Sequence, residues 1–358
     1  MSKKLAAPSR RLLSQPAFGS QDVSPVLMWG LAVVVAALAP LFAGPWLLST
    51  IRDALVMGIL ALSYDVLWGR AGVLTLGHTA FLGLGAYGFA VATVQFGQAP
   101  LVGLALGVLC AAGVATLIGY FLLFAGVRLH FFAIISLAVL IVAQQIAVSW
   151  QSVTGGDTGI LGIPGLSLRL GNHVFDLSDP RASWYIVAGV LLAATSLVWL
   201  VCRSQYGKVL GAIATNEWRA KACGYHTSLH LLIVFVASAM LAAIGGALMA
   251  ACSGVVAPDV FSPLLATEVI LWVAIGGRGR IGGPVVAAVV LTLLKQAVSS
   301  YSTDGWPLML GALFLACVLY MPSGLRIHPL VRSVRHIRHV LRASQPVRPA
   351  GHAQEEQS

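Results

Sequence analysis

Hydrophobic residues in this chain form long runs that are separated by short polar or glycine-rich breaks. A helix that crosses the ~30 Å hydrocarbon core of a bilayer needs roughly 20 predominantly apolar residues. Most of the runs meet or approach this length, so the pattern predicts an all-α, polytopic transmembrane helical bundle of about ten spans. We expect these spans at about residues 26–48, 51–68, 72–96, 100–125, 129–150, 184–202, 230–252, 264–277, 282–299 and 306–321.

The basic residues between the spans predict how the chain is oriented. Lys and Arg concentrate in the cytoplasmic connections of membrane proteins. If the N-terminus is cytoplasmic, every strongly basic connection falls on the same side; these are Arg70, Arg128, the group from Arg203 to Lys221, Arg278 with Arg280, and the C-terminal tail. Only Arg52 and Lys295 lie near the opposite ends of spans, where both can snorkel toward water. Both termini are therefore predicted to be cytoplasmic.

This topology divides the chain into three parts. We expect a cytoplasmic N-terminal segment (1–25), a transmembrane domain (26–321) and a basic cytoplasmic tail (322–358). Within the domain, residues 151–183 form a periplasmic loop and residues 203–230 a cytoplasmic loop, in which a short amphipathic helix ends near Gly224. The tail has the spacing of a helix that lies on the anionic inner leaflet, but a solvated, mobile tail explains its composition equally well.

Composition agrees with a membrane protein and argues against nucleic acid as a partner. Hydrophobic residues make up 58% of the 358 positions, charged residues 9%, and the mean hydropathy is +0.88. The net charge of +10 lies mostly on the two terminal segments, where basic residues hold a chain on the cytoplasmic side. The five cysteines are scattered singly, so we expect no metal site and no catalytic residue.

Polar residues within the second and third spans mark a candidate solute path. The stretch "LSYDVLWGRAGVLTLGHTAFLGLGAYGFA" places Asp65, Thr75, His78 and Thr79 among closely spaced glycines. Such groups cost free energy in hydrocarbon unless they face protein or water, and glycines let a helix unwind or approach a neighbour closely. We expect these four residues to line the path; the alternative is that each only hydrogen-bonds a neighbouring helix.

The stretch "ATEVILWVAIGGRGRIGG" is the second candidate. Its apolar run of about 14 residues is too short to cross a bilayer exposed to lipid, so it should lie inside the bundle, with Glu268 on the solute path. It also matches G-x-G-x-x-G, but a dinucleotide loop needs a strand before it, and here both flanks are spans. We therefore expect a tight cytoplasmic turn that contains Gly276, Gly277, Arg278 and Gly279.

Four blocks, in order, carry a resemblance to a known family. They are "GRAGVLTLGHTAFLGLGAY", "TGGDTGI", "GKVLGAIATNEWRAKACGY" and "VILWVAIGGRGRIGGPVVAA". The chain resembles the permease subunits of ABC importers for branched-chain amino acids and for urea and short amides, and its last block is slightly closer to the urea type. The resemblance covers roughly residues 50 to 325.

The resemblance implies a multi-pass protein of the bacterial inner membrane, with a second homologous permease, two ABC ATPase subunits and a periplasmic solute-binding protein as partners. It also implies that Glu217, Arg219 and Gly224 belong to the loop that couples to the ATPase; Trp218 and Cys223 depart from the usual pattern there. The chain lacks a G-x-x-x-x-G-K-[ST] loop, so we expect no cofactor in it and ATP on the partner subunits. The alternatives are a secondary transporter or channel for a small polar solute and, less well matched by the residues, a membrane enzyme.

Overall fold

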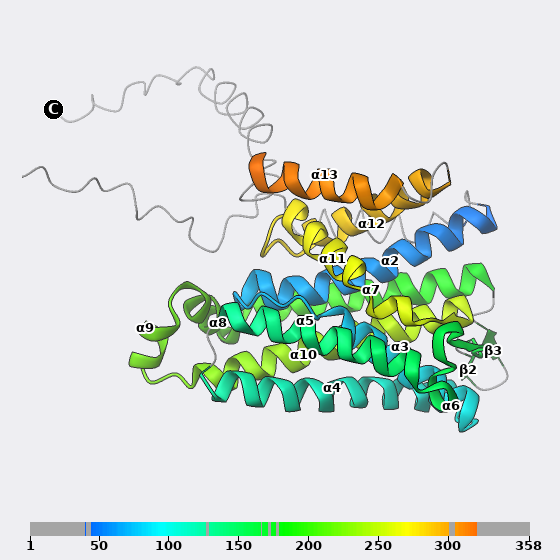
Figure 1. The fold of residues 1–358 in the computed structure, drawn as a ribbon, viewed down its shortest axis with the longest axis horizontal. Helices are drawn as coiled ribbons and strands as arrows, with labels where there is room; N and C mark the ends of the chain where they lie inside the picture. The colour runs from blue at the N-terminus through cyan, green and yellow to red at the C-terminus, as the bar shows by residue number, and fades with distance from the viewer. Residues whose placement is uncertain are drawn as a thin grey trace, which may run out of the picture.

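The computed structural model describes residues 40, 44–126, 129–165, 167–170, 173–176, 179–300 and 305–320, which form a helical bundle (Figure 1). Six described helices are long and apolar enough to cross a membrane, and three shorter apolar helices accompany them. The long ones are Pro45–Arg70 (α2, Pro45–Asp65, continued by the π-helix η2, Val66–Arg70), α4 (Pro100–Phe124), α5 (Leu129–Ser149), α7 (Pro180–Arg203), α10 (Thr227–Ser253) and α12 (Gly282–Ser299). The shorter ones are α3 (Thr79–Ala90, continued by the π-helix η3, Val91–Gln95), α11 (Pro263–Gly276) and α13 (Gly305–Tyr320).

The predicted span positions agree with these helices, with two differences. The expected third span, 72–96, is helical only from Thr79. The expected first span lies mostly outside the described residues, and α2 begins at Pro45, where the sequence pattern had placed the end of that span. Proline at the first helical position favours a helix start because its missing N–H is not needed there. The total of ten spans and the location of the termini stay predictions.

Helices α2 and α10 form the centre of the bundle. About 61% of the most apolar part of each is buried, against 28% for α4, α5 and α7 and 22% for α12. α2 packs against α7, α10, α11 and α12, whereas α10 packs against α3 and α4. The outer helices expose apolar side chains that suit lipid, for example Leu109, Phe121 and Ile134.

The two ends of the bundle differ (Figure 1). One end carries the short helices α8 (Gln205–Thr215) and α9 (Glu217–Ala222), and we call it the α9 end. The other end, the hairpin end, carries α6 (Gln151–Thr154) and an antiparallel hairpin of β2 (Ser167–Leu170) and β3 (His173–Asp176). The remaining short elements are η4 (Gly156–Thr158), β1 (Ile160–Leu161), β4 (Val255–Val256) and η5 (Pro258–Phe261).

The sequence pattern predicted an all-α fold, whereas the structure adds four short strands, β1 to β4. β1 pairs with β4 through Ile160 opposite Val256, which ties the polar segment 151–183 to the residues that follow α10. These strands are short and belong to the connections, so the bundle itself remains helical.

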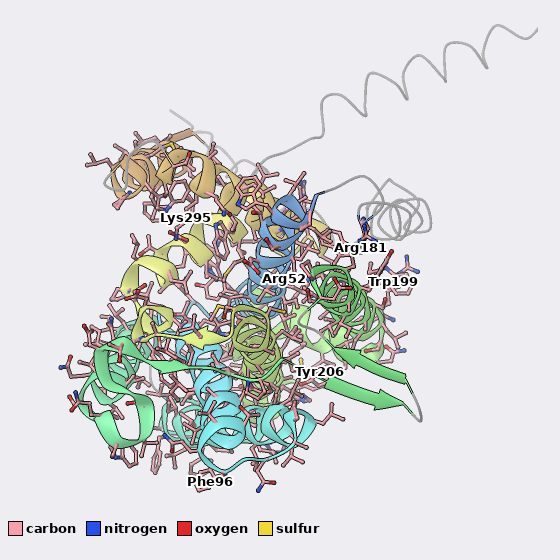
Figure 2. The ribbon with its side chains drawn as sticks, turned by 90° about the vertical axis from the view of Figure 1, so that its right-hand side faces the viewer. Arg52, Phe96, Arg181, Trp199, Tyr206 and Lys295 are labelled. Carbon is pink, nitrogen blue, oxygen red and sulfur yellow. The ribbon has the colours of Figure 1, made fainter. Side chains whose placement is uncertain are left out.

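The two cations that opposed the charge trend are held by protein groups. Arg52 is 8% exposed, and its guanidinium donates to Asp53 Oδ1 (2.9 and 3.0 Å) and to Ser183 Oγ of α7 (3.2 Å). Figure 2, seen from the hairpin end, shows Arg52 on α2 next to α7 and Lys295 on the side of α13. Lys295 binds Glu268, as described below.

Close packing between α3 and α10 gives a stability prediction. A Cβ atom at Gly246 would overlap the Leu82 carbonyl oxygen, whereas a Cβ at Gly113 in α4 would meet nothing within 4 Å. We expect Gly246→Ala to destabilise the protein by about 3 kcal/mol through overpacking. Gly113→Ala should stabilise it slightly, by about 0.5 kcal/mol, because alanine favours helix. Thermal unfolding midpoints in detergent measure both changes, and equal effects of the two substitutions would contradict the packing.

Candidate solute path and coupling surface

The first candidate feature is an unwound segment, residues 71–78, between η2 and α3. It has no regular secondary structure, yet Ala71, Val73, Thr75 and His78 are each at most 3% exposed. α3 consequently begins at Thr79 inside the bundle, where Thr79 is fully buried. Such irregular backbone at membrane depth is tolerated only where it is buried in protein or lines a cavity.

Side chains from neighbouring helices satisfy the polar backbone groups of this segment. Tyr64 of α2 donates its hydroxyl proton to the Thr75 carbonyl oxygen (2.8 Å). Ser136 Oγ of α5 accepts from the Leu76 N–H (3.1 Å). A Cβ atom on Gly77 would overlap the Ser136 carbonyl oxygen, so glycine allows α5 to approach. Contacts from α2 and α5 therefore stabilise the unwound conformation of this segment.

His78 is the polar centre of the segment. Its Nε2 lies 2.9 Å from Ser63 Oγ, while its ring meets Tyr64 and Phe81 edge-on at centroid distances of 5.4 and 5.9 Å. The His78 Nδ1 and Thr79 Oγ1 atoms are buried without a hydrogen-bond partner among the described residues. Three of the predicted path residues, Thr75, His78 and Thr79, thus lie together, and His78 and Thr79 each retain a buried polar atom without a partner.

Asp65 lies apart from these three residues, next to the α11–α12 turn. Its Oδ1 accepts from the Gly279 N–H at 2.7 Å, and its side chain is 1% exposed. In the turn, Gly277 and Gly279 have φ values of +89° and +76°, which strongly favour glycine. The turn joins two helices, so the G-x-G-x-x-G match has no strand before it.

Glu268 also lies apart, and it connects three helices. Its Oε1 accepts from Lys295 Nζ of α12 (2.8 Å) and from Trp306 Nε1 of α13 (2.7 Å), and Glu268 is 1% exposed. Sequence reasoning missed both partners. Lys295 could have been suspected because it is a cation near the non-cytoplasmic end of a predicted span, where a buried acidic partner is useful. No local sequence pattern pointed to Trp306.

The coupling candidate, residues 203–230, folds into α8 and α9. Asn216 caps α9 by accepting the Arg219 N–H at 2.9 Å, and the chain leaves the helix through Gly224, with φ +89°. Glu217 is bound within the loop, by Lys221 Nζ (2.8 Å) and by Thr227 Oγ1 (3.1 Å). Burial raises the pKa of the Tyr206 phenol, which stays neutral and donates to the His230 carbonyl oxygen (3.2 Å).

The outward face of α9 presents an unusual side chain. Trp218 is 78% exposed, beside the exposed Arg219, and Tyr225 just beyond the helix is 45% exposed. Exposed aromatic residues together with arginine are typical of protein-binding surfaces.

Among the described residues, no group of three His, Cys, Asp or Glu side chains could hold a metal ion.

The contacts of Glu268 predict a structural role that can be measured. Glu268→Ala should destabilise the protein by about 2 kcal/mol or more, because it leaves Trp306 Nε1 and Lys295 without their shared acceptor. Glu268→Gln keeps an acceptor oxygen and should cost less. Thermal unfolding in detergent tests the order, and solute uptake that falls at unchanged stability in Glu268→Gln would instead support a place on the path.

Comparison with known proteins shows the family of the chain. The model of the family described as branched-chain amino acid transport system / permease component matches residues 46–319. The high-affinity branched-chain amino acid transport system permease protein LivM of Salmonella typhimurium is 28% identical over 330 residues, which cover 87% of this chain and 77% of LivM.

Two further relatives match shorter parts of the chain. LivH of Escherichia coli, a permease protein of the same kind of system, is 26% identical over 164 residues, 46% of this chain and 52% of LivH. The fructose import permease protein FrcC of Rhizobium meliloti is 26% identical over 242 residues, 63% of this chain and 64% of FrcC. All three are transport permeases rather than enzymes. The chain belongs to the family of permease components of branched-chain amino acid transport systems, and it is a membrane-embedded ABC transport subunit.

Proposed function

We propose that this chain is one of two permease subunits in an ATP-driven importer for branched-chain amino acids. The observation that carries the proposal is the match to LivM over 87% of the chain. The partners would be a second, homologous permease, two ABC ATPase subunits and a periplasmic binding protein that delivers the solute. ATP would be bound and hydrolysed on the ATPase subunits, with no cofactor in this chain.

In this proposal the α9 end faces the cytoplasm. Arg70, Arg203 and Arg278 all belong to elements that meet at this end, since η2 contacts α8 and the Gly279 turn, and α7 leads into α8. A concentration of arginine on one side is the usual mark of the cytoplasmic face. The hairpin end would then meet the binding protein. The basic tail, for which a helix on the inner leaflet and a solvated tail were both expected, lies outside the described residues.

The outward face of α9 would dock on an ATPase subunit. Trp218 and Arg219 are free to make that contact because they are exposed, whereas Glu217 is engaged by Lys221 and Thr227. Glu217 and Gly224 would then maintain the conformation of the α9 segment. The binding energy for the ATPase subunit would come from Trp218 and Arg219. Movement of α8 and α9 would reach the path through η2, which contacts α8.

The solute would pass along the unwound segment. His78 and Thr79 offer unpartnered polar atoms there, Thr75 lies beside them, and the aromatic rings of Tyr64 and Phe81 flank His78. Aromatic rings suit an apolar side chain, and unused hydrogen-bonding groups suit the polar backbone of an amino acid. Urea or a short amide is the second candidate, and the run "VILWVAIGGRGR" favours it; both solutes need the same complex.

Uptake into proteoliposomes tests the proposal. The two permeases, the ATPase subunits and ATP are enclosed, the binding protein is added outside, and radiolabelled leucine and urea are compared. Leucine uptake that requires ATP and the binding protein is expected. Urea uptake under the same conditions would select the second candidate, and gradient-driven uptake by this chain alone would mean a secondary transporter or channel.

Substitutions on α9 test the docking face. Trp218→Ala and Arg219→Glu should each lower ATP-driven uptake about tenfold, because buried Trp and Arg anchors often contribute 1–3 kcal/mol to an interface. Lys208→Glu, a charge reversal at an exposed position of α8, is the matched control and should change uptake less. Co-purification of the ATPase subunits measures the contact itself. Normal uptake in both α9 variants would contradict the docking assignment.

A further inference from the structure

The end of α2 meets two other parts of the molecule at the α9 end. Asp65 of α2 accepts the Gly279 N–H of the α11–α12 turn at 2.7 Å. The Arg278 guanidinium lies over the Trp68 ring, 4.7 Å from its centroid. Gly72, two residues beyond η2, lies against Ala214 of α8: a Cβ atom at Gly72 would be 3.4 Å from the Ala214 Cβ. η2 therefore joins the coupling segment, the turn and the unwound segment.

The approach of η2 to the turn leaves no spare space. A Cβ atom at Gly69 would overlap Asp65 Oδ1 and lie 2.5 Å from the Gly279 nitrogen. The Asp65 carboxylate and the turn can thus be this close only because residue 69 is glycine. The contact lies at the α9 end of the unwound segment, where Ala71 and Val73 are 3% and 1% exposed.

Next to this contact lies a candidate second partner for the Asp65 carboxylate, the Arg70 side chain. Asp65 Oδ2 and Arg70 Nε are both buried without a partner among the described residues. Arg70 follows Asp65 by five residues, which is one turn of the π-helix, and its Nε lies 4.0 Å from the Cβ position of Gly279. If the turn moves away, Arg70 can replace the Gly279 N–H at the carboxylate, so that the charge is not left unpaired.

We propose that Asp65 is a gating residue: its carboxylate latches η2 to Gly279 while the path is closed at the α9 end, and exchanges Gly279 for Arg70 when that end opens. Asp65 acts on the solute only through the position of the unwound segment, so it is a positioning residue. A π-helix at this point suits a hinge, because such segments interrupt the regular helix. The inference rests on the proposed function for the cytoplasmic location of this end.

Labelling of a cysteine at position 73 reports opening directly. Val73→Cys is made in a chain whose native cysteines are replaced, and it is expressed with its partner subunits. A membrane-impermeant maleimide is then added to inside-out vesicles without solute or ATP. The parent should label slowly, because Val73 is buried, whereas Asp65→Ala should label about tenfold faster, as expected for loss of a charged hydrogen bond. The replaced cysteines are Cys110, Cys202, Cys223, Cys252 and Cys317.

Two further variants separate gating from damage to the fold. Asp65→Asn keeps an oxygen for the Gly279 N–H but loses the charge that attracts Arg70, so it should label as slowly as the parent and transport solute more slowly. Glu268→Ala removes the other buried carboxylate, which is equally 1% exposed, and should leave labelling at position 73 unchanged. These opposite responses are not expected from a general loss of packing.

Three results would overturn the proposal: Asp65→Ala labels like the parent, Asp65→Asn labels as fast as Asp65→Ala, or Glu268→Ala labels as fast as Asp65→Ala. Right-side-out vesicles are labelled in parallel. Faster labelling there and not in inside-out vesicles would overturn the assigned orientation while keeping the latch. Because the assay uses neither solute nor ATP, failure of the substrate assignment leaves its result unchanged.

Discussion

The structure depends on one constraint: a backbone N–H or carbonyl group within a membrane must have a partner in the protein. Helices meet this condition internally, but residues 71–78 leave the helix within the bundle. Some of their partners come from other helices, notably Tyr64 of α2 and Ser136 of α5. The unwound segment therefore exists only because α2, α3 and α5 are already packed around it, and a shift of any of these helices alters the segment.

The short helix α11 is positioned by two buried carboxylates: Glu268 within the helix and Asp65, which binds the turn after its C-terminal end. Glu268 binds Lys295 and Trp306 and so connects α11 to α12 and α13, while Asp65 binds the turn that follows α11. Fourteen residues cannot span a bilayer unaided, so such contacts and the neighbouring helices must fix its depth. The contact at Glu268 holds α11, α12 and α13 together, whereas the contact at Asp65 connects the α11–α12 turn to η2 and thus to the coupling segment. Of these two contacts, only the one at Asp65 can transmit movement from the coupling segment to the turn.

Local pattern was enough to predict most of the helices. The expected run 264–277 corresponds to α11, Pro263–Gly276, and 282–299 is α12, because glycines and prolines delimit apolar runs there. Contacts between distant residues were not predictable: the β1–β4 pairing, the Ser136–Leu76 bond and the Glu268–Trp306 bond join positions that no periodicity relates. For the same reason, sequence grouped Asp65 and Glu268 with Thr75, His78 and Thr79 on one path. The structure brings only the last three together, and whether they contact solute stays a prediction.

In the proposed importer, solute crosses the membrane along the unwound segment, in contact with Thr75, His78 and Thr79. The most direct measurement is a cryo-electron microscopy structure of the assembled importer, trapped with an ATP analogue and the loaded binding protein. We expect solute density within hydrogen-bonding distance of His78 Nδ1 or Thr79 Oγ1, beside a segment that remains unwound. Solute density elsewhere in the assembly, with residues 71–78 packed as in the present structure, would contradict it.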